Sequence, residues 1–397
     1  MNSVPQQLPA SLKTNLRLSQ WLGIHADGTV SVRSGKVEIG QGIATALAQL
    51  VAGELGVALT RIRMLPAGTR HSPDEGVTAG SLSVQESGAA LRQVCAEARA
   101  IFLTAAAQRL GVAPEALEVD DGSIRVRGSE QRSSYWELAH DDLSGGLLER
   151  EVSGSVTPGP VPQDGVVGRN VPRLDIPDKV SGRPRFIHDM VLPGLLYGRI
   201  ARPPSPAARL VEVDLTAVNA LPGVVASVRD GRFLGVIADS EYAVVKALKK
   251  LVSVAKWVES VTLPDRHDLP AFLHTQAHET QLYAEKKADA PEAPAAQSFS
   301  ASYSRPYLAH ASIGPSCALA RYSPEALEVW THSQGIYNLR TDLAKVMALP
   351  TGSISVQHVE GAGCYGHNGA DDVACDAALL ARAVPGRPVQ VQWTRED

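Results

Sequence analysis

The sequence predicts an α+β fold that is divided into domains. Two stretches far apart in the chain, 30–56 and 353–383, both read as a strand, a glycine turn and a helix. The stretches 153–168 and 288–296 are rich in glycine, proline or alanine, as linkers are. The 397 residues suffice for two or three domains of ordinary size. We therefore expect domains over 1–155, 165–290 and 297–397.

The composition is that of an ordinary globular protein and excludes several classes of function. The chain has 44% hydrophobic and 20% charged residues and a formal net charge of −4, so no basic excess indicates a nucleic-acid partner. The first twenty residues are polar, and no run approaches the roughly 18 apolar residues that span a membrane. The sequence therefore predicts a cytoplasmic protein without a membrane span.

The four cysteines form no C-x-x-C pair. An iron–sulfur cluster, a zinc ribbon or a c-type haem bound to this chain is therefore not expected. Free thiols also suit a reducing compartment.

The Gly-Gln-Gly turn (Gly40, Gln41 and Gly42) is the first candidate binding element. It follows an alternating strand and precedes a helix over 43–55, and both glycines can adopt positive φ at no steric cost. Free amides at a helix start attract anions, and the Gln41 amide can donate and accept. The turn is neither a dinucleotide fingerprint, because Thr45 replaces a glycine, nor a P-loop. An ordinary tight turn explains it equally well.

The Thr-Ala-Gly-Ser loop (residues 78–83) opens a second helix, which is rich in alanine and runs to about 110. Ser83 and Glu86 have the spacing of a capping box, and capping alone would explain these two residues. It would not explain the preceding run of small and hydroxyl residues. Two such loops favour a large anionic ligand.

The rest of the chain alternates strands and helices. We expect a hairpin at 117–126, strands at 209–214, 224–228 and 233–238, and an amphipathic helix at 242–252. Ser300, Ser302 and Ser304 alternate along a further expected strand. The strand at 327–330 leads to Gln334-Gly335, and the strand at 353–358 leads to a second glycine-rich turn. The chain ends after the strand at 389–393, in what reads as the middle of a fold.

Four of these motifs together resemble the molybdenum-binding large subunit of the xanthine dehydrogenase family. They are Gly35-Lys36-Val37-Glu38-Ile39-Gly40-Gln41-Gly42, Pro306-Tyr307-Leu308-Ala309-His310-Ala311, Trp330-Thr331-His332-Ser333-Gln334-Gly335 and Gly363-Cys364-Tyr365-Gly366. The segment 171–182 is similar to the entry of that family's α/β-hammerhead domain. Because the Gly-Gln-Gly segment comes first, the order resembles the N-terminal half of the isoquinoline 1-oxidoreductase and nicotinate dehydrogenase branch.

The resemblance implies that segments 1–155 and 297–397, the second truncated, bind a molybdopterin cofactor on either side of a hammerhead domain. The expected form is the molybdenum–molybdopterin cytosine dinucleotide. By resemblance, Gln41 faces the cofactor, and the 78–83 loop binds its pterin and phosphate end. The expected cofactor-binding residues are Gly40, Gln41, Gly42, Thr78, Ala79, Gly80, Ser81, Ser83, Gln334, Gly335, Gly363, Cys364, Tyr365, Gly366 and His367. No side chain is expected to ligate the metal.

The family's chemistry is the hydroxylation of an electron-poor carbon with water as the source of oxygen. The resemblance implies an N-heteroaromatic (nicotinate- or isoquinoline-like) or aldehyde substrate. It also implies a small [2Fe-2S] subunit as electron partner and admits a cytochrome as acceptor.

Two departures from the family pattern affect these expectations. The family's general base, a glutamate, belongs to a late segment that this chain does not reach, so we assign no catalytic residue and expect a second large-subunit half to carry it. Gly314 replaces a glutamate found in many relatives, which leaves the substrate open. A non-catalytic assembly or scaffold protein is therefore the alternative, and an enzyme of this kind would be inactive without its other half.

Cys364 and His367 each keep an alternative interpretation. Cys364 can be a ligand, although a small packing residue in a glycine turn is the simpler reading. His367 either contacts the cofactor or caps the following helix. His310 and His332 are expected to be structural.

Overall fold

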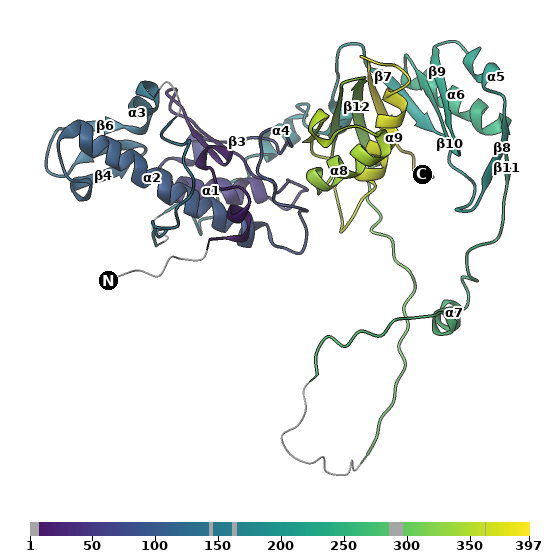
Figure 1. The fold of residues 1–397 in the computed structure, drawn as a ribbon, viewed down its shortest axis with the longest axis horizontal. Helices are drawn as coiled ribbons and strands as arrows, with labels where there is room; N and C mark the ends of the chain where they lie inside the picture. The colour runs from purple at the N-terminus through teal and green to yellow at the C-terminus, as the bar shows by residue number, and fades with distance from the viewer. Residues whose placement is uncertain (1–7, 143–145, 161–164, 286–296, 362) are drawn as a thin grey trace.

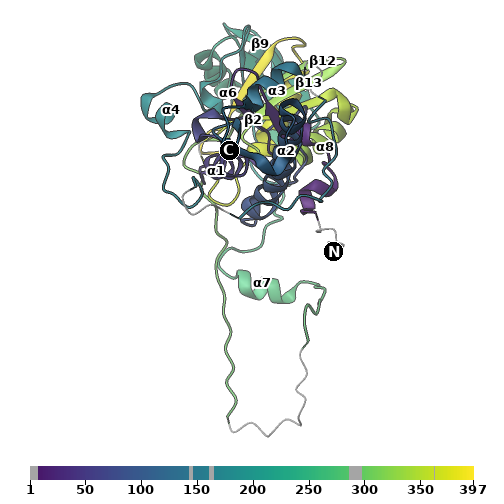
Figure 2. The same cartoon turned by 90° about the vertical axis from the view of Figure 1, so that its left-hand side faces the viewer.

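The computed structural model describes residues 8–142, 146–160, 165–285, 297–361 and 363–397. A body formed by residues 8–142 and 146–160 lies beside a second body that contains the C-terminal strands (Figure 1). The described residues 259–285 and 297–309 form a long excursion that projects away from both bodies in two perpendicular views (Figure 2).

The first body is built on two long helices that pack against each other. They are α1 (Ile43–Leu55) and α2 (Ala89–Leu110), as the apolar periodicity predicted. Two small sheets flank them, β1-β2-β3 and β4-β5-β6, and α3 (Tyr135–Asp141) closes the body. The strands are β1 (Leu22–Ile24), β2 (Val30–Val32), β3 (Ile62–Met64), β4 (Leu117–Asp120), β5 (Ser123–Val126) and β6 (Arg132–Ser134).

A glycine allows the two long helices to approach each other. A single turn of π-helix (Val84–Gly88) precedes α2, and a Cβ atom on Gly88 would lie 2.9 Å from Leu50 of α1. An alanine there would require the Leu50 side chain to shift. The close approach places the π-helical turn against Leu47 and Leu50 in the middle of α1.

The second body contains a seven-stranded sheet in the order β14-β13-β12-β15-β7-β10-β9. The pairs β13–β14 and β15–β7 are parallel, and the other neighbours are antiparallel. Its strands are β7 (Leu196–Ile200), β9 (Val224–Asp230), β10 (Phe233–Ala238), β12 (Cys317–Ser323), β13 (Ala326–Thr331), β14 (Ile354–His358) and β15 (Pro388–Gln392). A separate ribbon pairs β8 (Arg209–Val213) with β11 (Ala255–Val258).

The stretches 165–290 and 297–397, which the sequence predicts as separate domains, contribute strands to this one sheet. Val389 of β15 pairs with Leu196 of β7, and this parallel register joins them. The expected linker, 288–296, lies outside the described part of the chain. The sheet therefore continues across the predicted boundary, because strand pairing between distant segments leaves no signal in local composition.

Helices cover both faces of the seven-stranded sheet. On one face, Ile237 belongs to a core with α8 (Ile336–Met347) and α9 (Ala370–Ala381). Its neighbours Val236 and Ala238 point the other way and pack with α6 (Glu241–Val254). The other α-helices of the described residues are short: α4 (Ile176–Ser181), α5 (Leu215–Asn219) and α7 (Leu269–Thr275).

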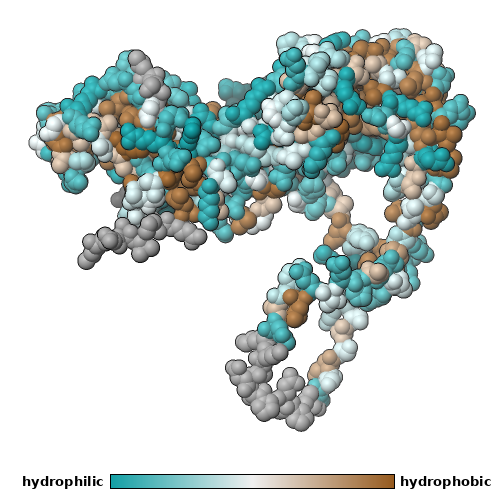
Figure 3. Space-filling view, viewed as in Figure 1, coloured by the Kyte–Doolittle hydropathy of each residue, from teal (hydrophilic) through white to brown (hydrophobic). Residues whose placement is uncertain are grey.

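The expected strand through Ser300, Ser302 and Ser304 is wrong in the structure. This segment belongs to the excursion and has no regular structure, and Phe299 and Tyr303 are 90% and 93% exposed. In the space-filling view, the described part of the excursion carries apolar surface well away from the two bodies (Figure 3). Alternation predicts a strand only where a sheet edge is available to pair with it.

Candidate functional site

Three of the predicted binding segments meet at Gln334. The Thr78 amide donates to the Gln334 carbonyl, and Nε2 of Gln334 donates back to the Thr78 carbonyl, both at 2.9 Å. The Cys364 thiol donates to Oε1 of Gln334 at 3.1 Å. The Gly335 amide bonds the Ser333 hydroxyl at 3.1 Å, just before α8. Segments that are 30 to 256 residues apart in sequence thus form one cluster.

Within the Thr-Ala-Gly-Ser loop, only Thr78 is buried. Its hydroxyl accepts a hydrogen bond from the Val37 amide at 2.9 Å, which ties the loop to the strand-like stretch before the Gly-Gln-Gly turn. The hydroxyls of Ser81 and Ser83 have no partner among the described residues. The exposed residues of the loop are Ala79, Gly80, Ser81 and Leu82. The loop therefore presents uncommitted donors and acceptors to solvent.

The predicted capping box at Ser83 is wrong. Ser83 itself has helical dihedrals (φ −58°, ψ −42°) and its side chain makes no capping bond, because the helix already starts as a π-turn. The Glu86 amide donates to the Leu82 carbonyl instead, at 2.8 Å. The Glu86 carboxylate pairs with Lys36 at 2.6 Å. Its role is to neutralise a buried cation.

The Gly-Gln-Gly turn has the backbone that an anion site requires, and a carboxylate of the chain occupies it. The Glu38 carboxylate accepts hydrogen bonds from the amides of Gly40, Gly42 and Ala44 at 2.9, 2.9 and 3.1 Å. Arg173 lies 3.5 Å from the same carboxylate. Gly42 has φ +83°, which turns the amides inward. The anion attraction inferred from sequence is thus met internally.

The Gln41 side chain is committed to its own loop. Its Nε2 donates to the Val37 carbonyl at 2.9 Å, and its Oε1 accepts from the Ile39 amide at 2.7 Å. These bonds hold the turn in shape. Among the described residues, the Gln41 side chain has no hydrogen bond to the Gln334 cluster, and its expected placement facing the cofactor stays a prediction.

The second glycine-rich turn exposes an aromatic ring beside the Gln334 cluster. Gly363 and Gly366 have φ of +103° and +128°, and Tyr365 between them has φ +57°. Tyr365 is 55% exposed, whereas Cys364 is buried. The packing interpretation of Cys364 agrees with this burial and with its bond to Gln334.

His367 does not cap α9. Oδ1 of Asn368 accepts from the Ala370 amide at 3.0 Å, so the neighbouring asparagine meets the helix start. The His367 ring is exposed and lies edge-on to His310, with centroids 6.5 Å apart. His310 at the base of the excursion thus lies beside the candidate site.

Sequence reasoning missed His358, the side chain that connects the Gly-Gln-Gly turn to the Gln334 cluster. It ends β14, is 5% exposed, and lies 3.0 Å from the carbonyl oxygens of Ser333 and Glu38. Its place on the buried face of an alternating strand was the only available signal. The contact with Glu38 joins two residues that are 320 positions apart in the sequence.

A network of ion pairs fixes the hammerhead-like segment beside the site. Lys179 bridges Asp175 at 2.5 Å and Glu360 at 2.6 Å, and Arg185 pairs with Glu360 at 2.7 Å. Hydrogen bonds from Arg173 and Lys179 hold the pKa of Asp175 well below its usual range. Glu360 thus serves as an anchor for two cations just before the second glycine-rich turn.

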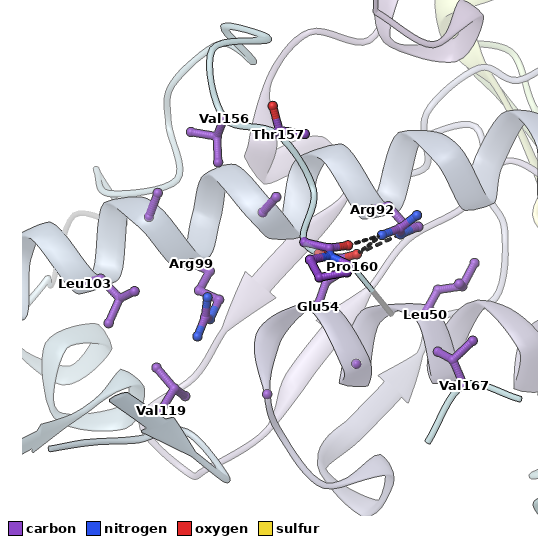
Figure 4. Close-up of a pocket in the computed structure, with 15 residues that line it drawn as sticks. Leu50, Glu54, Arg92, Arg99, Leu103, Val119, Val156, Thr157, Pro160 and Val167 are labelled. Atoms are coloured by element: carbon purple, nitrogen blue, oxygen red, sulfur yellow. Dashed lines mark hydrogen bonds and ion pairs between the residues drawn. The ribbon is translucent and has the colours of Figure 1, made fainter. Parts of the chain in front are cut away.

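A cavity of about 700 Å³ lies behind the Gly-Gln-Gly turn. It is bordered by Lys36, Glu38 and His358 on one side and by Phe186 and Met190 on the other. A second pocket of about 450 Å³ lies between α1 and α2, where Arg92 pairs with Glu54 (Figure 4). Neither pocket contains a member of the Gln334 cluster.

His332, beside the site, predicts an acid-sensitive fold. It is 4% exposed, its Nε2 accepts from the Cys317 amide at 3.3 Å, and its Nδ1 has no partner among the described residues. Burial, mainly, lowers its pKa to about 4. The unfolded chain takes up this proton near pH 6.5, so the free energy of unfolding falls as the pH falls from about 6.5 to about 4.

We expect protonation linked to His332 to lower the free energy of unfolding by about 3 kcal/mol between pH 6.5 and pH 4. The measurement is urea denaturation across that range for the wild type and for His332→Gln, which has no such proton. Parallel pH profiles for the two proteins would contradict the prediction.

No group of three or more histidine, cysteine or acidic side chains in the described ranges could hold a metal ion. Among the same residues, none of the helices has the length and apolar character needed to cross a membrane. The expectation that no side chain ligates a metal stays a prediction.

Comparison with known proteins finds cofactor-binding domains in this chain. It matches molybdopterin cofactor-binding domains over residues 7–162 and again over 273–397. It is 37% identical over 389 residues to a subunit of nicotinate dehydrogenase from Pseudomonas putida, which covers 96% of this chain and 32% of that one. It is 25% identical over 436 residues to the beta subunit of isoquinoline 1-oxidoreductase from Brevundimonas diminuta, covering 95% and 54%.

Among solved structures, the chain is similar to quinoline 2-oxidoreductase from Pseudomonas putida 86. The TM-score is 0.45 and the identity 23%, over 58% of this chain and 35% of that one. The chain thus spans between about a third and about half of the length of these curated relatives.

Proposed function

The chain belongs to the molybdopterin-binding subunits of the xanthine dehydrogenase family, in the branch of nicotinate dehydrogenase and isoquinoline 1-oxidoreductase, and we propose on this premise that it is part of a molybdenum hydroxylase. The substrate is an N-heteroaromatic compound, of the nicotinate or isoquinoline kind, or an aldehyde. Water supplies the oxygen, and an iron–sulfur subunit receives the electrons. The names of the relatives support this class of reaction.

The observation that carries the proposal is the convergence of three segments at Gln334. A pterin with a phosphate tail needs many hydrogen-bond donors on small residues, and the 78–83 loop offers exposed amides and two hydroxyls that have no partner in the described part of the chain. We propose that this loop, the Gln334-Gly335 turn and the 363–367 turn hold the molybdopterin, in the cytosine dinucleotide form. When bound, that group supplies two-electron redox chemistry.

The chain's own residues would bind and orient this group. The reciprocal bonds of Thr78 and Gln334 fix two of the loops relative to each other, and the Cys364 thiol holds the third. Tyr365 is exposed beside them and can cover one side of a ligand. We assign the general base to a second large-subunit half, because the glutamates that the structure describes near the site are already engaged. Glu38, Glu86 and Glu360 are all committed to bonds described above.

The proposal predicts that Gln334→Ala lowers the molybdenum content of the purified complex severalfold. The matched control is Gln131→Ala, an exposed glutamine on the first body. The measurement is metal analysis of the complex, with mass spectrometry of every chain that co-purifies. Stoichiometric molybdenum in the wild type, together with a chain carrying the missing half, is the expected result.

The alternative is a non-catalytic scaffold that keeps the fold without the cofactor. A metal-free and inactive wild-type complex would overturn the hydroxylase and favour this scaffold. Equal molybdenum in wild type and Gln334→Ala would instead refute the assigned binding cluster.

A further inference from the structure

His358 contacts one backbone carbonyl on each side of the candidate site. Nδ1 lies 3.0 Å from the Ser333 oxygen, next to Gln334, and Nε2 lies 3.0 Å from the Glu38 oxygen, next to the Gly-Gln-Gly turn. The side chain is 5% exposed, so water does not replace either contact. Thr78 also links the two segments, through its hydroxyl to the Val37 amide and through its backbone to Gln334. Among the described residues, His358 is the one whose side chain alone contacts both the 37–44 stretch and the 333–335 turn.

The chemistry of the two contacts is unequal. A carbonyl oxygen only accepts, and a neutral imidazole has one N–H donor and one lone pair. A neutral His358 therefore donates to one carbonyl at a time, and an imidazolium donates to both. Burial lowers its pKa, and the two carbonyls, with Glu360 and Glu38, act in the opposite direction. His332 is the other titratable ring that faces it.

We propose that His358 is a positioning residue that couples the Gly-Gln-Gly turn to the Gln334 cluster through these two carbonyls. The Glu38 residue whose carbonyl it holds also places its carboxylate on three amides of the turn. The Ser333 carbonyl lies next to the residue that joins Thr78 and Cys364. A neutral ring donates to one carbonyl and packs against the other, so its position constrains both loops, and its role toward a cofactor rests on the proposed function.

The test uses two variants that each keep one of the two contacts. The amide nitrogen of His358→Asn replaces Nδ1 and keeps the bond to Ser333, whereas that of His358→Gln replaces Nε2 and keeps the bond to Glu38. Amide hydrogen exchange is measured on the full chain without any cofactor. In His358→Asn, we expect exchange over 38–44 to be faster by about tenfold, with 333–335 nearly unchanged. In His358→Gln, we expect the opposite pattern.

His25→Gln is the control, because the His25 ring lies on the first body and, in the described part of the chain, hydrogen-bonds only to Ser31. Equal loosening of both segments in the two variants, or of neither, would overturn the proposal. Should both variants fail to fold, nitrogen-15 spectra of the wild type decide it. A His358 ring N–H that exchanges slowly with water is expected, and a freely exchanging ring would refute the coupling.

These readouts do not depend on molybdenum. If exchange shows the selective pattern while the complex contains no molybdenum, the coupling holds and the proposed function fails. If the exchange pattern is absent while molybdenum is present, only the coupling fails.

Discussion

Replacing Glu86 with glutamine should lower the free energy of unfolding by about 3 kcal/mol, because it leaves a buried ammonium without its counter-ion. The Lys36 side chain is 2% exposed, and its Nζ lies 2.6 Å from the Glu86 carboxylate. Carbonyls of Glu75 and Val77, at 2.7 and 3.3 Å, still accept from it in the variant. These carbonyls and the 30% exposure of Glu86 place the effect at the low end for a broken buried pair.

A double-mutant cycle separates this charge effect from packing. Lys36→Met removes the ammonium, so Glu86→Gln should cost far less in the Lys36→Met background than in the wild type. Urea denaturation of the four proteins gives the coupling free energy. Gln85→Ala, on the exposed neighbouring position, is the control and should change stability by less than about 0.5 kcal/mol. A coupling near zero would show that the Lys36–Glu86 pair is solvated.

The parts of this fold that sequence predicted correctly are those set by local chemistry. The helix over 43–55 has a continuous apolar stripe and ends at Gly56, whose φ is +68°. The hairpin turn at Asp121 and Gly122 has positive φ at both residues, as its sequence requires. In each case the residues that dictate the structure lie within one turn of it. Contacts with distant segments are not needed to predict these two features.

The internal partners of the site's polar groups could not be predicted in the same way. Free amides at residues 40–44 correctly indicated an anion, but nothing in the sequence shows that Glu38 supplies it rather than a ligand. The same limit applies to Glu86, whose spacing fits a cap and whose actual partner, Lys36, is fifty residues away in sequence. A motif gives the chemistry of a group, and only the fold gives its partner.

The strand predicted from the alternating serines at 298–304 is wrong for a related reason. Period-two alternation describes a face, and a strand forms only when a neighbour completes its hydrogen bonds. The described residues offer this segment no such neighbour. By contrast, β15 finds β7 and β12 on its two sides and forms as predicted.

The second large effect is expected from Glu38→Ala, which empties the anion site of the Gly-Gln-Gly turn. Three amides at the start of α1 lose their acceptor, and Arg173 keeps only its bonds to Asp175 and the Gly40 carbonyl. Charge-assisted bonds of this kind are worth roughly 1.5–3 kcal/mol each but are not additive, and water can replace part of them at this half-exposed turn. We expect a loss of about 2 kcal/mol in the free energy of unfolding.

Inorganic sulfate should then restore part of the stability of this variant and not of the wild type. The emptied turn combines a helix N-terminus with an arginine, which is the usual setting for binding an anion. Thermal unfolding is measured with sodium sulfate and with sodium chloride at matched ionic strength. Sulfate stabilises folded proteins in general. The relevant quantity is therefore how much more sulfate raises the unfolding temperature of Glu38→Ala than that of wild type and of the exposed control Glu118→Ala.

The outcome bears directly on how the proposed cofactor is held. A larger sulfate-dependent rise in the unfolding temperature of the variant would show that the wild-type turn is closed to anions by its own carboxylate. The phosphate end of a molybdopterin would then have to rely on the 78–83 loop, where the described residues leave the hydroxyls of Ser81 and Ser83 without a partner. Equal sulfate responses in all three proteins would mean that the emptied turn does not bind sulfate. The amides of Gly40 and Gly42 would then be poor candidates for binding the cofactor's phosphates as well.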